Sequence, residues 1–181
     1  MKFIYVIFLS ATALAGGCTT DTMLQLGPDG RPLPKIYRIS NGTESTIQFQ
    51  MLDSINALRR AAYIRPMAFN SALNAAAATH SRDMAMQNRA WHFGSDGSSP
   101  MTRAERAGYQ GGFLGETISE TFETELETLS AWMSREDTKG VILDPRANDV
   151  GFSWHQELNG KIWWTLVTGT ITNLAPVQGK I

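Results

Sequence analysis

Cysteine is almost absent from this chain of 181 residues, which contains one. A single cysteine excludes an intramolecular disulfide and a zinc site built from several thiolates. Net charge is also lacking, since 16 basic and 17 acidic side chains leave −1 at neutral pH. So small a charge argues against a broad nucleic-acid-binding surface. The hydrophobic residues, at 43%, suffice for a buried core and exclude disorder along the whole chain.

Long apolar runs are missing too, apart from one at the N-terminus. After Lys2, the stretch 3–15 is interrupted only by Ser10 and Thr12. This run is shorter than the roughly 20 apolar residues of a transmembrane helix. A short apolar run followed by small residues is the layout of a cleaved signal peptide, which we predict over residues 1–17.

The single cysteine, Cys18, directly follows the small residues Ala15, Gly16 and Gly17. This ending resembles the lipobox of bacterial lipoproteins, with Ala15 where leucine is commoner. The resemblance implies cleavage before Cys18 and attachment of a diacylglycerol and an N-acyl chain, enough for stable membrane anchoring. Thr19 in place of an aspartate implies anchoring in the outer membrane, facing the periplasm. The alternative is an ordinary signal peptide with a chance cysteine.

The rest of the chain divides into a tether, a domain and a tail. Residues 18–45 comprise the acylated cysteine and a tether rich in glycine, proline and polar residues. Within it, residues 35–40 are predicted as a short strand. We expect one folded domain over residues 46–172 and a C-terminal tail over residues 173–181.

The apolar pattern of the domain predicts helices first and strands last. Ile47, Met51 and Ile55 recur four residues apart, the spacing of an amphipathic helix. Asn159-Gly160 lies between two apolar runs and signals a β-hairpin. Helices followed by an antiparallel hairpin indicate an α+β fold. The predicted helices cover residues 46–62, 72–88, 100–107 and 121–134, an extended segment covers 111–120, and the hairpin strands cover 148–156 and 161–168.

Four groups of segments, in this order, resemble the CAP superfamily. Its SCP-like domains occur in cysteine-rich secretory proteins, insect venom antigens and plant pathogenesis-related proteins. The resemblance spans residues 46–169 and implies an α-β-α sandwich with a small antiparallel sheet between helical layers. The segments are LDSINALR (52–59); LNAAAATHSRDM (73–84) with AWH (90–92); RAGY (106–109) with GETI (115–118); and AWMS (131–134) with VGF (150–152) and IWWT (162–165).

The family's cleft is usually lined by two histidines and two glutamates, which in some members bind a divalent metal. The resemblance places His92 and Glu116 at two of these four positions. Thr138 stands where the second histidine is expected, and the second glutamate position falls near Arg135, beside Glu136. We therefore expect His92, Glu116, Glu136 and Thr138 to line the cleft.

Metal binding is not expected to be strong in such a cleft. His92 and Glu116 are the weak candidates for holding an ion such as zinc, and a tight zinc site needs three or four protein ligands. We therefore predict no cofactor and assign no catalytic residue. Alternatively, His92 only makes hydrogen bonds within its loop, and Glu116 is a structural carboxylate.

The other histidines and the tryptophans are predicted to be structural. His80 lies among alanines in a predicted helix, which favours a packing role. His155 is expected to contact Trp164 across the hairpin. The tryptophans expected in the core or on the sheet are Trp132, Trp154, Trp163 and Trp164.

The function predicted from these features is a non-enzymatic binding module, anchored to the membrane through Cys18. Its ligand would be an envelope lipid, a peptidoglycan fragment or a protein. One alternative is a peptidase-like hydrolase that activates water through His92 and Glu116. The missing second histidine argues against that alternative. Another is a purely structural envelope lipoprotein.

Lipidation can be tested by replacing Cys18. The Cys18→Ala precursor has no thiol to acylate, so it should remain unlabelled in cells fed radioactive palmitate, whereas the wild-type chain should be labelled. A variant labelled as strongly as the wild type would refute the lipobox assignment.

Overall fold

The structure, a computed structural model, describes residues 36–121 and 123–171. The predicted signal peptide, Cys18 and the C-terminal tail lie outside the described residues. The elements are α1 (Glu44–Ala61), β1 (Ala68–Phe69), α2 (Ser71–Gln87), α3 (Pro100–Arg106), β2 (Gly112–Thr121), α4 (Glu125–Met133), α5 (Glu136–Ile142), β3 (Asp149–Gln156) and β4 (Ile162–Thr170).

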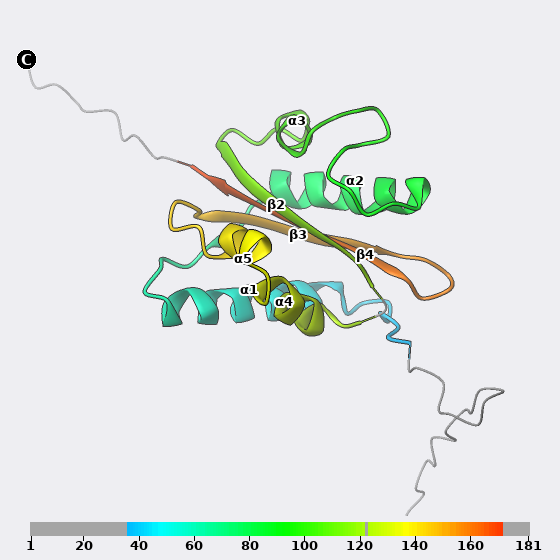
Figure 1. Cartoon of the computed structure of the whole chain (residues 1–181), viewed down its shortest axis with the longest axis horizontal. Coiled ribbons are helices and arrows are strands. Elements are labelled where there is room, and N and C mark those ends of the chain that lie inside the picture. The colour runs from blue at the N-terminus through cyan, green and yellow to red at the C-terminus, as the bar shows by residue number, and fades with distance from the viewer. Residues whose placement is uncertain (1–35, 122, 172–181) are drawn as a thin grey trace, which may run out of the picture. The chain divides into compact units, whose positions relative to one another are not determined.

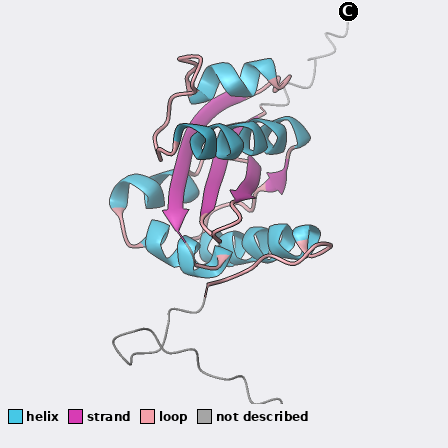
Figure 2. Cartoon of the chain, turned by 90° about the vertical axis from the view of Figure 1, so that its right-hand side faces the viewer, coloured by secondary structure: helices cyan, strands magenta, loops and turns pink. Residues whose placement is uncertain are grey.

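The strands form one sheet of order β1-β3-β4-β2, in which β1 is parallel to β3 and the other pairs are antiparallel. In Figure 1, α2 and α3 lie above this sheet and α1, α4 and α5 lie below it. The turned view in Figure 2 also shows helices above and below the strands. The α-β-α sandwich implied by the resemblance is therefore confirmed.

Alternation along the strands divides the core into two parts. Phe152, Trp164 and Leu166 point to one face and pack against α1, α4 and α5. Val167 points to the other face, among apolar side chains of α2 and α3. The rings of Phe152 and Trp164 stack with their centroids 5.5 Å apart. Two apolar clusters, one on each face of the sheet, thus stabilise a domain in which a single cysteine allows no intramolecular disulfide.

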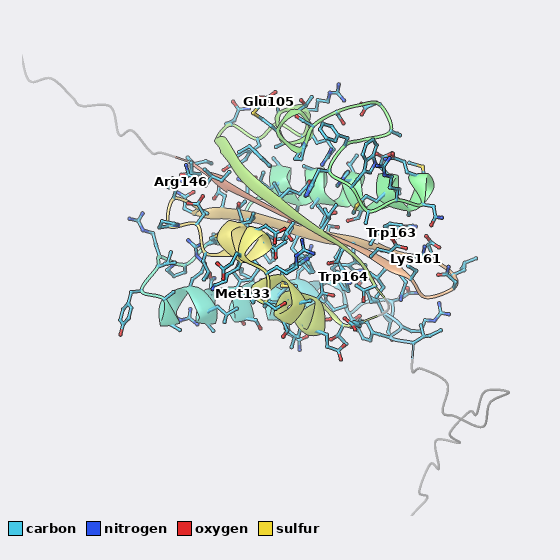
Figure 3. The ribbon with its side chains drawn as sticks, viewed as in Figure 1. Glu105, Met133, Arg146, Lys161, Trp163 and Trp164 are labelled. Carbon is cyan, nitrogen blue, oxygen red and sulfur yellow. The ribbon has the colours of Figure 1, made fainter. Side chains whose placement is uncertain are left out.

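The hairpin register differs by one residue from the expectation. His155 pairs with Trp163, and Trp154 pairs with Trp164, so the predicted contact of His155 with Trp164 is wrong. The cause is the turn: Glu157 N–H donates to Lys161 O, which places three residues in the loop where Asn159-Gly160 predicted two. Figure 3 shows Trp163 and Lys161 near the hairpin end and Trp164 on the side of α4.

The first helices match the prediction to within two residues, but three other elements do not. β2 continues to Thr121, so α4 begins only at Glu125. The side chain of Thr124 accepts from Glu127 N–H and the Glu127 carboxylate accepts from Thr124 N–H, a capping box that fixes this start. The helix α5 and the two-residue strand β1 were not predicted.

Residues 36–40 do not form the predicted strand. Gln156 bridges this segment, donating from Nε2 to Tyr37 O (2.8 Å) and accepting at Oε1 from Ile39 N–H (3.0 Å). Tyr37 and Ile39 also pack on the core below the sheet. The alternation of apolar and polar residues over 36–40 thus reflects an extended segment that packs on the core and is held by the Gln156 side chain. The compact unit begins at Ile36, ten residues before the domain start expected from the sequence.

Arg59 ties α1 to the loops at one end of the sheet. Its fully buried guanidinium donates to the carbonyl oxygens of Arg65 (2.8 Å), Ile142 (2.7 Å) and Ala147 (2.8 Å). These bonds satisfy a buried charge with main-chain dipoles. They connect the segment before β1 with the segment before β3, the two strands that pair in parallel.

None of the helices in residues 36–121 and 123–171 combines the length and apolarity that a membrane crossing needs.

Close packing of α2 on β3 makes Gly151 a sensitive position. A Cβ there would lie 2.6 Å from Asn74 N and would overlap the Leu73 carbonyl group. Gly151→Ala should therefore lower the free energy of unfolding by about 1–3 kcal/mol, measured by urea denaturation. The control is Gly140→Ala in α5, where no atom lies within 4 Å of the added Cβ. Alanine should stabilise that helix by about 0.5–1 kcal/mol. Equal effects at both glycines would contradict this account of the packing.

Candidate functional site

Glu116 lies at the centre of a buried polar cluster on the α2–α3 side of β2. Its side chain is 2% exposed. Arg103 of α3 donates from Nη2 to both carboxylate oxygens, at 3.0 Å and 2.8 Å. From Nη1 it donates to the main-chain oxygens of His92 (2.9 Å) and Ser98 (3.0 Å). One guanidinium therefore neutralises Glu116 and also holds the loop between α2 and α3.

Two histidines complete the cluster, one open to solvent and one enclosed. His92 has a half-exposed side chain whose Nδ1 lies 2.9 Å from Glu116 Oε1. His80 of α2 is fully buried, and its Nε2 lies 3.7 Å from the same oxygen. The structural role predicted for His80 thus includes contact with the one buried carboxylate of this cluster.

Burial dominates the electrostatics of His80. It lowers the pKa of the imidazole below the ordinary value of 6.5, and the positive charge of Arg103 acts in the same direction, against the opposing effect of Glu116. The neutral ring lies with Nε2 2.9 Å from Trp91 O. Because a carbonyl only accepts, we assign the proton to Nε2. Nδ1 is then a bare acceptor, and it has no partner among the described residues.

The arrangement does not fit a metal site. Arg103 occupies both oxygens of Glu116, and His92 directs Nδ1 at the same carboxylate. No three candidate ligand side chains among residues 36–121 and 123–171 are grouped so that they could hold an ion. The guanidinium supplies the positive charge that a cation would bring. The same hydrogen bonds leave Glu116 poorly placed to take a proton from water.

An open cleft of about 690 Å³ runs along β2 next to this cluster. Its volume falls within the range of small-molecule sites. Trp91 and Phe93 of the loop after α2 form one wall, with ring centroids 5.7 Å apart. Arg89 stacks 4.0 Å over the Trp91 ring and supports that wall. The other lining residues are Ala90, His92, Thr117, Ile118, Ser119, Glu120, Ala131, Trp132, Arg135, Asp137 and Thr138.

The four residues expected to line the cleft occupy different places. His92 and Thr138 do line it. Glu116 contacts His92 and accepts from Arg103, but it is not among the lining residues. Glu136 is absent from the lining, and its side chain is 90% exposed and pairs with Lys139.

On the α4–α5 side of the cleft, polar side chains bond to other groups of the protein. Thr138 Oγ1 donates to Trp132 O at 2.5 Å, so its hydroxyl connects the two helices. Arg135 Nη2 lies 2.8 Å from Asp137 Oδ2, with both side chains largely exposed at the rim. The hydrogen bond from Arg135 is the main cause that lowers the pKa of Asp137 to about 2. The rim thus carries a guanidinium–carboxylate pair at the expected second-glutamate position.

Sequence reasoning missed Arg103 altogether. The seven-residue helix α3 contains two arginines. Arg103 is buried, whereas Arg106 is 61% exposed and bonds to Asp96. In so short a helix no local pattern distinguishes the buried arginine from the exposed one. The signal that could have found it is the need of a buried carboxylate at Glu116 for a charged partner.

The structural class of the domain is a three-layer α-β-α sandwich with a cleft along one sheet edge, next to a buried histidine–glutamate cluster. The sequence profile of the Cysteine-rich secretory protein family, CAP, matches residues 52–168. The chain belongs to this family, as the resemblance of its motifs predicted.

Comparisons with individual proteins agree. "Uncharacterized protein YkwD" of Bacillus subtilis (strain 168) is 26% identical over 119 residues, which are 66% of this chain and 46% of that protein. The chain thus spans less than half of this relative. An outer surface protein from Borrelia burgdorferi superposes with a TM-score of 0.62 at 13% identity, over 75% of this chain and 98% of that one.

A similar match is an extracellular protein containing a SCP domain from Bacillus anthracis str. Ames. Its TM-score is 0.64 at 20% identity, over 81% of this chain and 45% of that one. At such identities, the two solved structures establish the fold alone.

The burial of His80 predicts acid sensitivity. Because its folded pKa lies below 6.5, its contribution to stability is full above that pH. It is lost as the pH falls, by up to about 1.4 kcal/mol per pH unit until the folded pKa is reached. His80→Gln should flatten the dependence of the unfolding free energy between pH 7.5 and 5.5, measured by urea denaturation at each pH. The control variant, His155→Gln, replaces an imidazole outside the cluster. The prediction fails if His80→Gln leaves the slope unchanged.

Proposed function

We propose that the protein is a membrane-anchored binding module of the bacterial envelope, whose cleft holds a ligand without hydrolysing it. The single observation that carries this proposal is that Arg103 Nη2 donates to both carboxylate oxygens of Glu116. It occupies the carboxylate that a hydrolase of this family pattern would need for activating water or binding a metal. No cofactor is part of the proposal.

The cleft itself supports a binding role. It is open, it has an aromatic wall at Trp91 and Phe93, and its rim offers the charged pair Arg135–Asp137. A mostly apolar hollow with a few polar groups is typical of ligand sites. The candidate ligands are those expected from the sequence: an envelope lipid, a peptidoglycan fragment or a protein.

Anchoring rests on Cys18 and the lipobox-like residues before it. The two similar solved structures are described as an outer surface protein and an extracellular protein, which fits export of this chain. We further propose attachment to the outer membrane with the domain facing the periplasm, because Thr19 follows the cysteine. The tether before Ile36 would hold the domain off the lipid surface.

Filling the cleft tests the binding role. Ala131 is an exposed residue of α4 that lines the cleft, and its neighbour Ser130 is exposed without lining it. The full-length protein should be purified from envelopes in detergent and its bound compounds measured by mass spectrometry. Ala131→Trp should reduce the bound compound by about tenfold or more, because the indole takes its space. Ser130→Trp should retain it.

Two results would overturn the proposal. Equal amounts of compound on both variants would show that the cleft is not the binding site. Hydrolysis of the bound compound by the wild type, lost in His92→Ala, would contradict the non-enzymatic role.

A further inference from the structure

The two edges of the sheet differ in length and covering. β1 at one edge has two residues, whereas β2 at the other has ten. A sheet edge presents unpaired main-chain N–H and C=O groups, and long regular edges are normally covered or interrupted. The first half of β2 follows this rule. It is interrupted by an irregularity between Phe113 and Gly115, where Val141 of α5 packs on the face of the strand, 2.9 Å from the place of a Cβ on Gly115.

The second half of β2 is different because residues 117–120 line the open cleft. Figure 1 shows β2 in front of β3 and β4, with α3 above and α4 and α5 below. The open edge therefore lies between the wall at Trp91 and Phe93 and the wall formed by the end of α4 and the start of α5.

The direction of the free groups follows from one hydrogen bond. Trp132 Nε1 donates to Ile118 O at 3.2 Å, so this carbonyl points away from β4 and towards α4. In an antiparallel ladder the N–H and C=O of one residue face the same side, and successive residues alternate. Ile118 and Glu120 therefore direct their N–H groups outward, while Thr117 and Ser119 bond to Leu166 and Trp164.

Nothing in the described part of the chain takes up these outward donors. Neither the loop and turn hydrogen bonds nor the side-chain hydrogen bonds of residues 36–121 and 123–171 use the N–H of Ile118 or Glu120. The indole N–H of Trp132 also donates to Ser119 Oγ at 2.8 Å, so it is shared between this hydroxyl and Ile118 O. The cleft thus has a floor of main-chain donors at strand spacing, whereas Ile118 O already accepts from Trp132.

We propose that an extended peptide binds in this cleft as an added strand, pairing with residues 117–120 of β2. This inference rests on the proposed function, that the cleft holds a ligand, and specifies the ligand's chemistry. An added peptide strand offers donors and acceptors at the same repeat as β2. An acyl chain offers none and would leave the edge groups unpaired.

The walls determine the preferred peptide sequence. Side chains of an added strand alternate between the two faces of the sheet. On one face they meet the aromatic pair Trp91–Phe93, which favours apolar side chains. On the other they meet Thr138 and the rim pair Arg135–Asp137, which favours polar ones. The expected ligand therefore alternates apolar and polar residues over about four to six positions.

The test uses the full mature chain in detergent micelles and a hexapeptide of alternating valine and threonine, blocked at both ends. Amide hydrogen exchange is followed by nuclear magnetic resonance. Bound peptide should slow exchange at Ile118 and Glu120 by about tenfold or more. Thr117 and Ser119, already bonded to β4, should change by less than about twofold. This pattern distinguishes strand addition from occupation of the cleft by side-chain contacts.

Two N-methylated peptides serve as the matched pair. In one the valine N–H groups are blocked, and in the other the threonine N–H groups. In an added strand only one of these sets faces β2, so one peptide should lose binding by about tenfold or more while the other binds as before. Ile118→Pro removes an edge N–H without breaking the ladder and should also weaken binding.

The outcomes separate this inference from the proposed function. Equal binding of both methylated peptides, or binding without protection at Ile118 and Glu120, would refute strand addition. Failure of the hexapeptide to bind, while the wild type carries an envelope compound that Ala131→Trp loses, would also refute it and leave the binding module standing. Absence of any compound in the cleft would instead refute the proposed function.

Discussion

Glu116 has its side chain almost wholly out of solvent, and its charge is balanced by two hydrogen bonds from Arg103. Transfer of such a pair from water costs several kcal/mol per ion, and removal of one partner costs about 3–5 kcal/mol. The pair therefore fixes α3 against β2. Because the same guanidinium also bonds to main-chain oxygens of His92 and Ser98, it also positions the loop that forms the aromatic wall of the cleft.

The ion pair keeps the charge of Glu116 out of the cleft. The carboxylate is buried inside the domain, and of the Glu116 cluster His92 is the residue that lines the cleft. On the opposite wall, Thr138 donates its hydroxyl to Trp132 O, and Arg135 and Asp137 pair with each other. A ligand in the cleft would meet aromatic surface, the main chain of β2, His92 and the exposed rim pair. These groups fit the recognition role that we propose for the cleft.

Sheet order explains why this main chain is available. Nearly every residue of β4 is buried, since it lies between β3 and β2 with helices on both faces. β2 has a neighbouring strand on one side only, and α5 packs on its face at Gly115. The same packing that buries Glu116 thus leaves Ile118 and Glu120, two and four residues along the strand, at an open edge.

Local patterns predicted the long elements and the short helix α3, but they missed α5 and β1. Apolar spacing found α1 and α2, and Asn159-Gly160 found the hairpin, because each signal lies within one continuous segment. The two residues of β1 are too few to show a period. The start of α4 was placed too early because β2 continues to Thr121, and pairing with β4 decided between strand and helix there.

The residues of the site were also predicted only in part. Motif resemblance assigned His92 and Glu116 to one site, and His92 Nδ1 lies 2.9 Å from Glu116 Oε1. It did not separate Thr138 from Glu136, which are two positions apart on α5 and so point in nearly opposite directions. It also missed Arg103, because an arginine is buried only by what other segments place around it.

By itself, then, the sequence determined the family, the α+β order of elements and the lack of disulfides, since these follow from residue types and spacing along the chain. Only the tertiary structure decided which charges are paired inside and which strand edge stays open. Burial and edge exposure depend on segments far apart in the chain, and no local pattern records them.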